Sequence, residues 1–156
     1  MHPPRLRTAD TFIGFGSATV GVVASDQDQI AEVVRTFFAA FTSGPDVEAR
    51  LDGLRDVLLP EALIVGTCGA PASYDVDGFI EPRRELLTSG RITEFREWEL
   101  DGTTEVYGDI AHRWCTYAKE WVEGGEHREG VGAKAIQLVR AESGWRISAV
   151  AWDDER

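Results

Sequence analysis

The chain has 156 residues, 43% of them hydrophobic, so it is long enough to form one domain whose core needs no disulfide or metal ion. Its formal net charge of −11, from 27 acidic against 16 basic residues, argues strongly against a nucleic-acid partner. Phosphate binding needs a basic stripe, and the densest basic cluster here is only Arg83 and Arg84. The acidic excess also disfavours an anionic membrane surface, and it favours a small molecule or a neutral or cationic partner.

Residues 1–25 have two interpretations. A basic start and an apolar run from Phe12 to Val23 imitate a secretory signal, but glycines and polar residues interrupt that run and Asp10 precedes it closely. We therefore predict an N-terminal arm over 1–25, followed by a single domain over 26–156. No stretch reaches the roughly 18 apolar residues of a membrane span.

The cysteines and histidines predict neither a disulfide nor a metal site. Cys68 and Cys115 lie in apolar, strand-like runs without a CxxC spacing, which favours buried free thiols in a reducing, cytoplasmic compartment. A bridge between the two is the alternative. His2, His112 and His127 lack the spacing of metal ligands, and the sixteen glycines form no phosphate loop. We expect no cofactor.

Two amphipathic helices open the domain. In residues 26–45 the apolar positions recur at helical spacing, and they are Ile30, Val33, Val34, Phe37, Phe38 and Phe41. Ser25, three residues ahead of Asp28, resembles a capping residue, and Gly44 with Pro45 ends the run. A second helix is predicted from Asp46 to near Pro60 by the same criterion.

A short apolar run over 62–68 predicts a buried strand, and residues 75–90 predict a third helix that Pro82 should kink or shorten. From Arg91 onward the period changes to two. Turn signals at 101–102, 108–109, 124–125 and 143–144 separate strands near 91–100, 103–107, 110–122, 127–140 and 145–152. Short links make neighbouring strands antiparallel. The order predicts an α+β domain in which helices pack on a curved antiparallel meander that forms a cone.

Several stretches resemble one known superfamily. They are DGFIEPRRELLTSG (77–90), VYGDIAHRWCTYAKEW (106–121) and AIQLVRAESGWRISAVAWDDE (135–155). Together with the first helix they resemble the nuclear transport factor 2-like (NTF2-like) superfamily, also called SnoaL-like or cystatin-like cone folds, over about residues 27–155. The resemblance implies a cone-shaped fold and a homodimer formed by packing sheets together.

The superfamily includes ketosteroid isomerase, scytalone dehydratase, polyketide cyclases and limonene epoxide hydrolase, as well as binding modules without catalysis. Fold alone does not decide among these activities. The chain shows no Asp–His pair like that of scytalone dehydratase and no Asp–Arg–Asp set like that of limonene epoxide hydrolase. It also lacks a match to the tyrosine and protonated acid of the isomerase. It most resembles the subgroup of largely unassigned function.

The strand over 110–122 divides its side chains between two faces. One face carries His112, Trp114 and Glu120, and the other carries Arg113, Cys115, Tyr117 and Lys119. An unpaired buried charge is costly, so the positions of Arg113 and Lys119 favour His112 and Trp114 on the inner face. The family resemblance favours the opposite choice. We expect the His112 face to point into the cone.

Candidate catalytic residues follow from that choice. His112 is a general acid or base, or alternatively a neutral imidazole that a backbone group or hydroxyl satisfies. Asp153 is a base at the mouth of the cone, or alternatively a solvated charge at the end of the last strand. Arg83 and Arg84 bind a carboxylate or, as we favour here, form a solvated helix face.

The aromatic residues outnumber what packing requires, so a subset is predicted to line a ligand pocket. These ligand-binding candidates are Phe38, Trp98, Trp114, Tyr117 and Trp152. The predicted function is binding of a small apolar or aromatic molecule, with cofactor-free acid–base catalysis of the isomerase, dehydratase or cyclase type. The alternative is a non-catalytic dimerisation or interaction module of the same fold.

Overall fold

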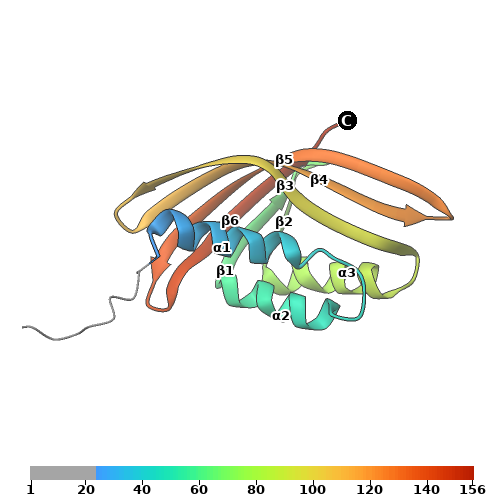
Figure 1. The fold of residues 1–156 in the computed structure, drawn as a ribbon, viewed down its shortest axis with the longest axis horizontal. Helices are drawn as coiled ribbons and strands as arrows, with labels where there is room; N and C mark the ends of the chain where they lie inside the picture. Colours follow the sequence, from blue (N-terminus) through green and yellow to red (C-terminus); the bar gives the residue numbers. More distant parts are fainter. Residues whose placement is uncertain (1–23) are drawn as a thin grey trace, which may run out of the picture.

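A computed structural model describes residues 24–156, so nearly all of the predicted N-terminal arm lies outside the described residues. Three helices pack against one face of a curved, six-stranded sheet (Figure 1). The elements are α1 (Asp26–Ala39), α2 (Val47–Val57), β1 (Leu58–Gly66), β2 (Ala72–Tyr74), α3 (Val76–Thr88), β3 (Ile92–Tyr107), β4 (Ile110–Glu123), β5 (Glu126–Ala141) and β6 (Gly144–Asp154). None of these helices is long and apolar enough to cross a membrane.

The three predicted helices are confirmed. In α1 the hydroxyl of Ser25 accepts a hydrogen bond from the backbone N–H of Asp28 at 3.1 Å, which satisfies one of the free donors of the first turn. The carboxylate of Asp75 caps α3 in the same way by accepting from the N–H of Gly78 at 2.7 Å. The assigned helix α3 continues through Pro82 to Thr88. The apolar stripes predicted for these helices supply much of the buried core.

The strand order in the sheet is β2-β1-β6-β5-β4-β3. Strands β3 to β6 form the predicted antiparallel meander, with turns at 108–109, 124–125 and 142–143. Strand β1 pairs with β6 in parallel, so the sheet is mixed, and the long segment from α3 to β5 provides the crossover that a parallel pair requires. The short strand β2, which pairs with β1, was not predicted.

The turn predicted at Asp101 and Gly102 is wrong. Strand β3 runs through both residues, with a register shift between Glu99 and Asp101. A Cβ atom at residue 102 would lie 2.6 Å from an η nitrogen of Arg113. The glycine is therefore needed for the close approach of this guanidinium to the strand, and does not mark a reversal of the chain.

The prediction for the two faces of β4 is also wrong. Cys115 and Tyr117 are buried on the inner face, whereas Trp114 is 54% exposed on the outer face. The argument from charge failed because both inward-facing cations find partners on other strands of the sheet. Arg113 pairs with Glu99, and Lys119 pairs with Asp154 at 2.8 Å. A paired charge avoids most of the penalty that an isolated one would bear.

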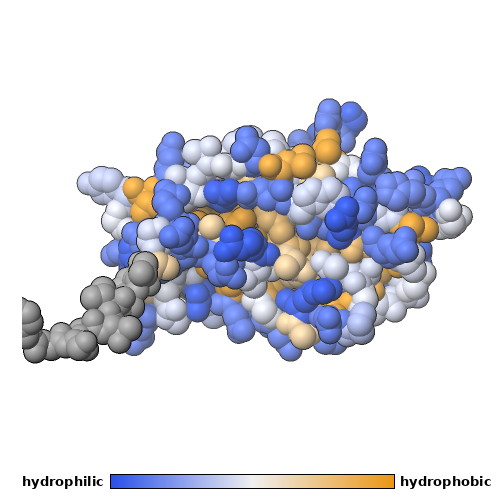
Figure 2. All heavy atoms as spheres, viewed as in Figure 1, coloured by the Kyte–Doolittle hydropathy of each residue, from blue (hydrophilic) through white to orange (hydrophobic). Residues whose placement is uncertain are grey.

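Apolar side chains also reach the molecular surface. In the view of Figure 2 they gather near the middle of the face, where α1 lies against the sheet, and polar side chains surround them. Of the two cysteines, which are both free, Cys115 is buried as predicted. The prediction is wrong for Cys68, which is exposed because it lies just beyond the end of β1.

Candidate functional site

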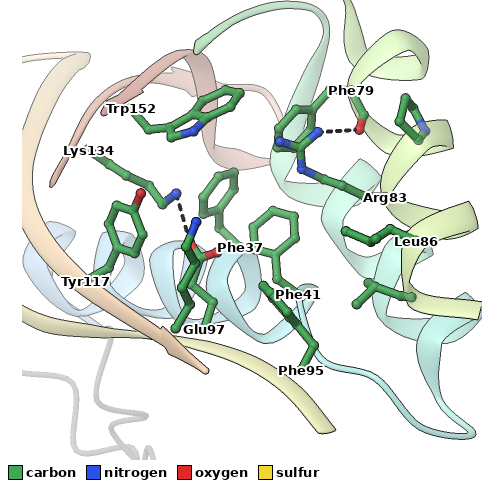
Figure 3. Close-up of a pocket in the computed structure, with 13 residues that line it drawn as sticks. Phe37, Phe41, Phe79, Arg83, Leu86, Phe95, Glu97, Tyr117, Lys134 and Trp152 are labelled. Carbon is green, nitrogen blue, oxygen red and sulfur yellow. Dashed lines mark hydrogen bonds and ion pairs between the residues drawn. The ribbon is translucent and has the colours of Figure 1, made fainter. Parts of the chain in front are cut away.

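A cavity of about 270 Å³ lies between α3 and the inner face of the sheet (Figure 3). Its wall combines residues from α1, α3 and four strands, so no single segment of the sequence defines it. The aromatic side chains of the wall are Phe37, Phe41, Phe79, Phe95, Tyr117 and Trp152. Charged side chains also face this space, namely Arg83, Glu97, Lys119 and Lys134. A mainly apolar wall with a few polar groups is typical of a small-molecule site.

The helical wall follows from spacing along the chain. Phe37, in the last turn of α1, and Phe41, just beyond its end, are four residues apart, and their rings meet edge to face with centroids 5.2 Å apart. The same spacing on α3 brings Arg83 over the ring of Phe79. Phe41 and Phe79 are also in edge-to-face contact at 5.8 Å, which joins the segment after α1 to α3 at the cavity.

An ion pair between Lys134 and Glu97 lies at the inner end of the cavity. Lys134 Nζ is 2.8 Å from Glu97 Oε1, and the two side chains are only 6% and 9% exposed. Their angles do not meet those of a hydrogen bond, so this buried carboxylate oxygen is paired by charge alone. The ammonium group also lies 4.0 Å from the ring centroid of Tyr117. Both charges are thus held among aromatic rings with little access to water.

A second polar cluster joins β4 to the end of β6. The hydroxyl of Tyr117 donates a hydrogen bond to Asp154 Oδ1, and Lys119 Nζ lies 2.8 Å from Oδ2 of the same carboxylate. Burial raises the pKa of Tyr117, and its hydrogen bond to Asp154 adds to the effect, so the phenol is protonated at neutral pH. Burial alone would raise the pKa of Asp154, but hydrogen bonds from Lys119 and Tyr117 bring its pKa below the ordinary value.

Gly132 provides the space for this second cluster. A Cβ atom at this position would lie 2.6 Å from Oη of Tyr117 and still closer to the backbone oxygen of Asp153. Backbone cannot shift as easily as the end of a side chain, so any larger residue would displace β6 or the phenol.

The predicted site residues divide between the two faces of the sheet. Of the predicted ligand-binding residues, Tyr117 and Trp152 line the cavity, whereas Phe38 is buried in the core beside Tyr117, with ring centroids 6.2 Å apart. Trp98 and Trp114 belong to the outer face.

Both predicted catalytic residues also lie on the outer face. Nδ1 of His112 is 2.9 Å from Nε2 of Gln137, in a partly exposed contact between β4 and β5. Asp153 is exposed, and its neighbour Asp154 is the acid that turns toward Tyr117 and Lys119. Adjacent residues of a strand point to opposite faces, so Asp154 points to the inner face and Asp153 to the outer face.

Sequence reasoning missed Glu97, Lys134 and Asp154. A signal for Lys134 was available, because it interrupts the run of small and apolar residues in the second half of β5. A single charge inside an otherwise apolar stretch predicts a buried pair, but its partner lies on a distant strand. Glu97 gave no such signal, because Arg96 and Glu99 make that part of β3 highly charged.

No protein-family model matches this sequence, and no curated protein matches it. Solved structures do match. An NTF2-like protein with a cystatin-like fold from Novosphingobium aromaticivorans is 18% identical, with 82% of this chain and 80% of that chain covered and a TM-score of 0.62. A nuclear transport factor 2-like superfamily protein from Salmonella enterica is 14% identical, with 81% and 89% covered and a TM-score of 0.67.

A third matching structure, of a protein from Kribbella flavida, is 17% identical, with 84% of this chain and 91% of that chain covered and a TM-score of 0.69. At such low identity the likenesses concern the fold alone. The chain has the α+β cone fold of NTF2-like proteins, which confirms the predicted fold class and the predicted resemblance.

Proposed function

We propose that this protein binds a small, largely aromatic molecule in the cavity between α3 and the sheet. The supporting observation is a space of about 270 Å³ whose wall has six aromatic side chains beside a buried ion pair. A cavity of about 150 Å³ already accommodates benzene, so this space suits a ligand of one or two rings.

Acid–base chemistry on such a ligand would use different residues from those predicted. Glu97 presents a buried carboxylate oxygen without a hydrogen bond, and the ammonium group of Lys134 lies beside it. We propose Glu97 as the proton acceptor and Lys134 as the proton donor of a cofactor-free isomerisation, dehydration or cyclisation. His112 and Asp153 have no part in this proposal because both belong to the opposite face of the sheet.

A pair of tryptophan substitutions on α3 tests ligand binding. Leu86 lines the cavity, so Leu86→Trp should fill it, whereas Glu85→Trp adds the same side chain at an exposed position. Ligand-observed NMR with a set of one- and two-ring aromatics should detect binding to the wild type and to Glu85→Trp, and none to Leu86→Trp. Equal binding by all three proteins, or by none, would contradict the proposal.

The outer face of the sheet supports the predicted homodimer as a second role. Leu100, Trp114 and Val131, on three adjacent strands, are 55%, 54% and 39% exposed. Large apolar side chains that cluster on a surface favour protein–protein contact. We propose that a second copy of the chain covers them.

Light scattering tests the dimer. The wild type should have twice the 17.2 kDa mass of one chain, and Trp114→Ser should reduce the mass to that of a monomer. Tyr107→Ser, which removes an exposed aromatic residue next to the β3–β4 turn, should leave the dimer intact. A monomeric wild type would refute this role without bearing on the cavity.

A further inference from the structure

The charges at the cavity do not balance. Three cations, Arg83, Lys119 and Lys134, face two carboxylates, Glu97 and Asp154, which leaves an excess of one positive charge. Lys134 is paired with Glu97, and Lys119 is paired with Asp154. The remaining cation is therefore Arg83. This local excess contrasts with the net charge of −11 for the whole chain.

Arg83 differs from its neighbour on α3. Arg84 forms ion pairs with Glu48 and Glu81 on the outside of the helical layer. Arg83 turns toward the cavity, is half-buried, and forms no ion pair with any carboxylate of residues 24–156. Burial lowers the pKa of Arg83 to about 10, and the charge of Glu97 opposes that effect. Arg83 is thus still a cation at neutral pH.

The contacts of Arg83 hold its guanidinium in place and leave donors free. Its central carbon lies 3.7 Å from the ring centroid of Phe79 and 5.2 Å from that of Trp152. One η nitrogen donates a hydrogen bond to the backbone oxygen of Phe79 at 3.0 Å (Figure 3). A guanidinium has five N–H donors, so most remain available to a ligand. Their planar arrangement matches the two oxygens of a carboxylate.

We infer that the ligand is an aromatic monocarboxylate whose acid group pairs with Arg83 while its ring lies among the aromatic side chains of the wall. This inference rests on the proposed function and gives it a ligand class. One carboxylate neutralises the single excess charge, whereas a phosphate monoester would bring about −1.5 to −2. The ring meets Phe41, Phe79, Phe95 and Trp152.

Calorimetry with matched acids and amides tests the inference on the full chain. The probes are benzoate and 2-naphthoate, and their neutral amides benzamide and 2-naphthamide. The wild type should bind each acid at least about tenfold more tightly than its amide, because a hydrogen bond to a charged group is worth more than a neutral one. Arg83→Gln should reduce that ratio to about one. Arg84→Gln should leave the ratio unchanged, since Arg84 points away from the cavity.

The outcomes separate the inference from the function on which it rests. Equal binding of acids and amides by the wild type would overturn the carboxylate class and leave ligand binding standing. An acid preference that survives in Arg83→Gln would overturn the role of Arg83. Failure of every probe to bind would overturn both. The acid-to-amide ratio of the wild type needs no variant, so it decides the ligand class even if Arg83→Gln does not fold.

Discussion

Two of the ion pairs on the inner face of the sheet differ in how completely each is satisfied. Arg113 Nε donates to Glu99 Oε2 at 2.8 Å, an η nitrogen of Arg113 donates to Glu99 Oε1, and the other donates to the hydroxyl of Thr104 at 2.6 Å. Lys134 and Glu97 lie deeper, at 2.8 Å, without hydrogen-bond geometry between them. The first pair is fully hydrogen-bonded and links two strands. In the second pair, Oε1 of Glu97 can still accept a hydrogen bond from another group.

Location accounts for this difference. Arg113 and Glu99 belong to adjacent strands, and their side chains are 15% and 24% exposed, so water still reaches the pair. Lys134 and Glu97 come from strands separated by β4, so their side chains meet across that strand. Their charges lie beside aromatic rings at the cavity. Buried polar groups that lack full partners are expected at functional sites more than in ordinary cores.

The largest effect is expected when Lys134 is removed. Lys134→Met keeps most of the volume but leaves Glu97 as an unpaired buried charge, so the free energy of unfolding should fall by about 3–5 kcal/mol. Urea denaturation followed by circular dichroism measures this loss. The double variant Glu97→Met/Lys134→Met should recover most of it, because no charge then remains unpaired. A double variant as unstable as the single one would show that packing, not charge, is responsible.

A smaller effect is expected at the other pair. Arg113→Met removes hydrogen bonds to a charged group, which should lower the free energy of unfolding by about 1.5–3 kcal/mol. The loss is smaller than for Lys134→Met because the carboxylate of Glu99 is more exposed and regains hydration. The same denaturation experiment measures it. A larger loss for Arg113→Met than for Lys134→Met would reverse the order proposed for the two pairs.

The smallest effect concerns the second polar cluster, formed by Tyr117, Lys119 and Asp154. Tyr117→Phe removes one hydrogen bond to Asp154 while Lys119 remains, so the free energy of unfolding should fall by about 1 kcal/mol near neutral pH. The folded-state pKa of Asp154 is depressed, so its contribution to stability is fully present above the unfolded value near 3.8 and is lost as pH falls below it. The hydrogen bond from the phenol contributes to the lowered pKa of Asp154. Tyr117→Phe lacks this hydrogen bond, so its free energy of unfolding should fall less than that of the wild type as pH decreases.

Denaturation at several pH values checks this expectation. The difference in stability between the wild type and Tyr117→Phe should be greatest near neutral pH and should shrink as pH falls below about 4. A difference that stays constant down to low pH would mean that the hydroxyl acts through packing alone.

Much of the fold was predictable because its signals are local. The stripe from Ile30 to Phe38 and the turns at 108–109 and 124–125 each depend on residues a few positions apart. The strand β2 and the parallel pairing of β1 with β6 were not predictable in this way, since both depend on contacts between distant segments. The role of Gly102 was not predictable for the same reason. A glycine is found there because of the side chain of Arg113, which is eleven residues away on the next strand.

The site was less predictable than the fold. Tyr117 and Trp152 were identified as pocket residues, whereas Glu97, Lys134 and Asp154 were not. The reason is that a charge is costly inside a protein only when it is alone. Whether Arg113 or Lys119 has a partner depends on which residues other strands of the sheet bring near it, and alternation along one strand cannot show this.

The sequence by itself determined the helices, the antiparallel hairpins and the α+β class, because hydrophobic periodicity and turn residues act over short distances along the chain. Tertiary structure alone decided which face of β4 is buried, which charges pair, and that Arg83 is the cation at the cavity without a carboxylate partner among residues 24–156. Those outcomes depend on the register and curvature of the sheet, which bring distant side chains together and so decide where a charge can be buried.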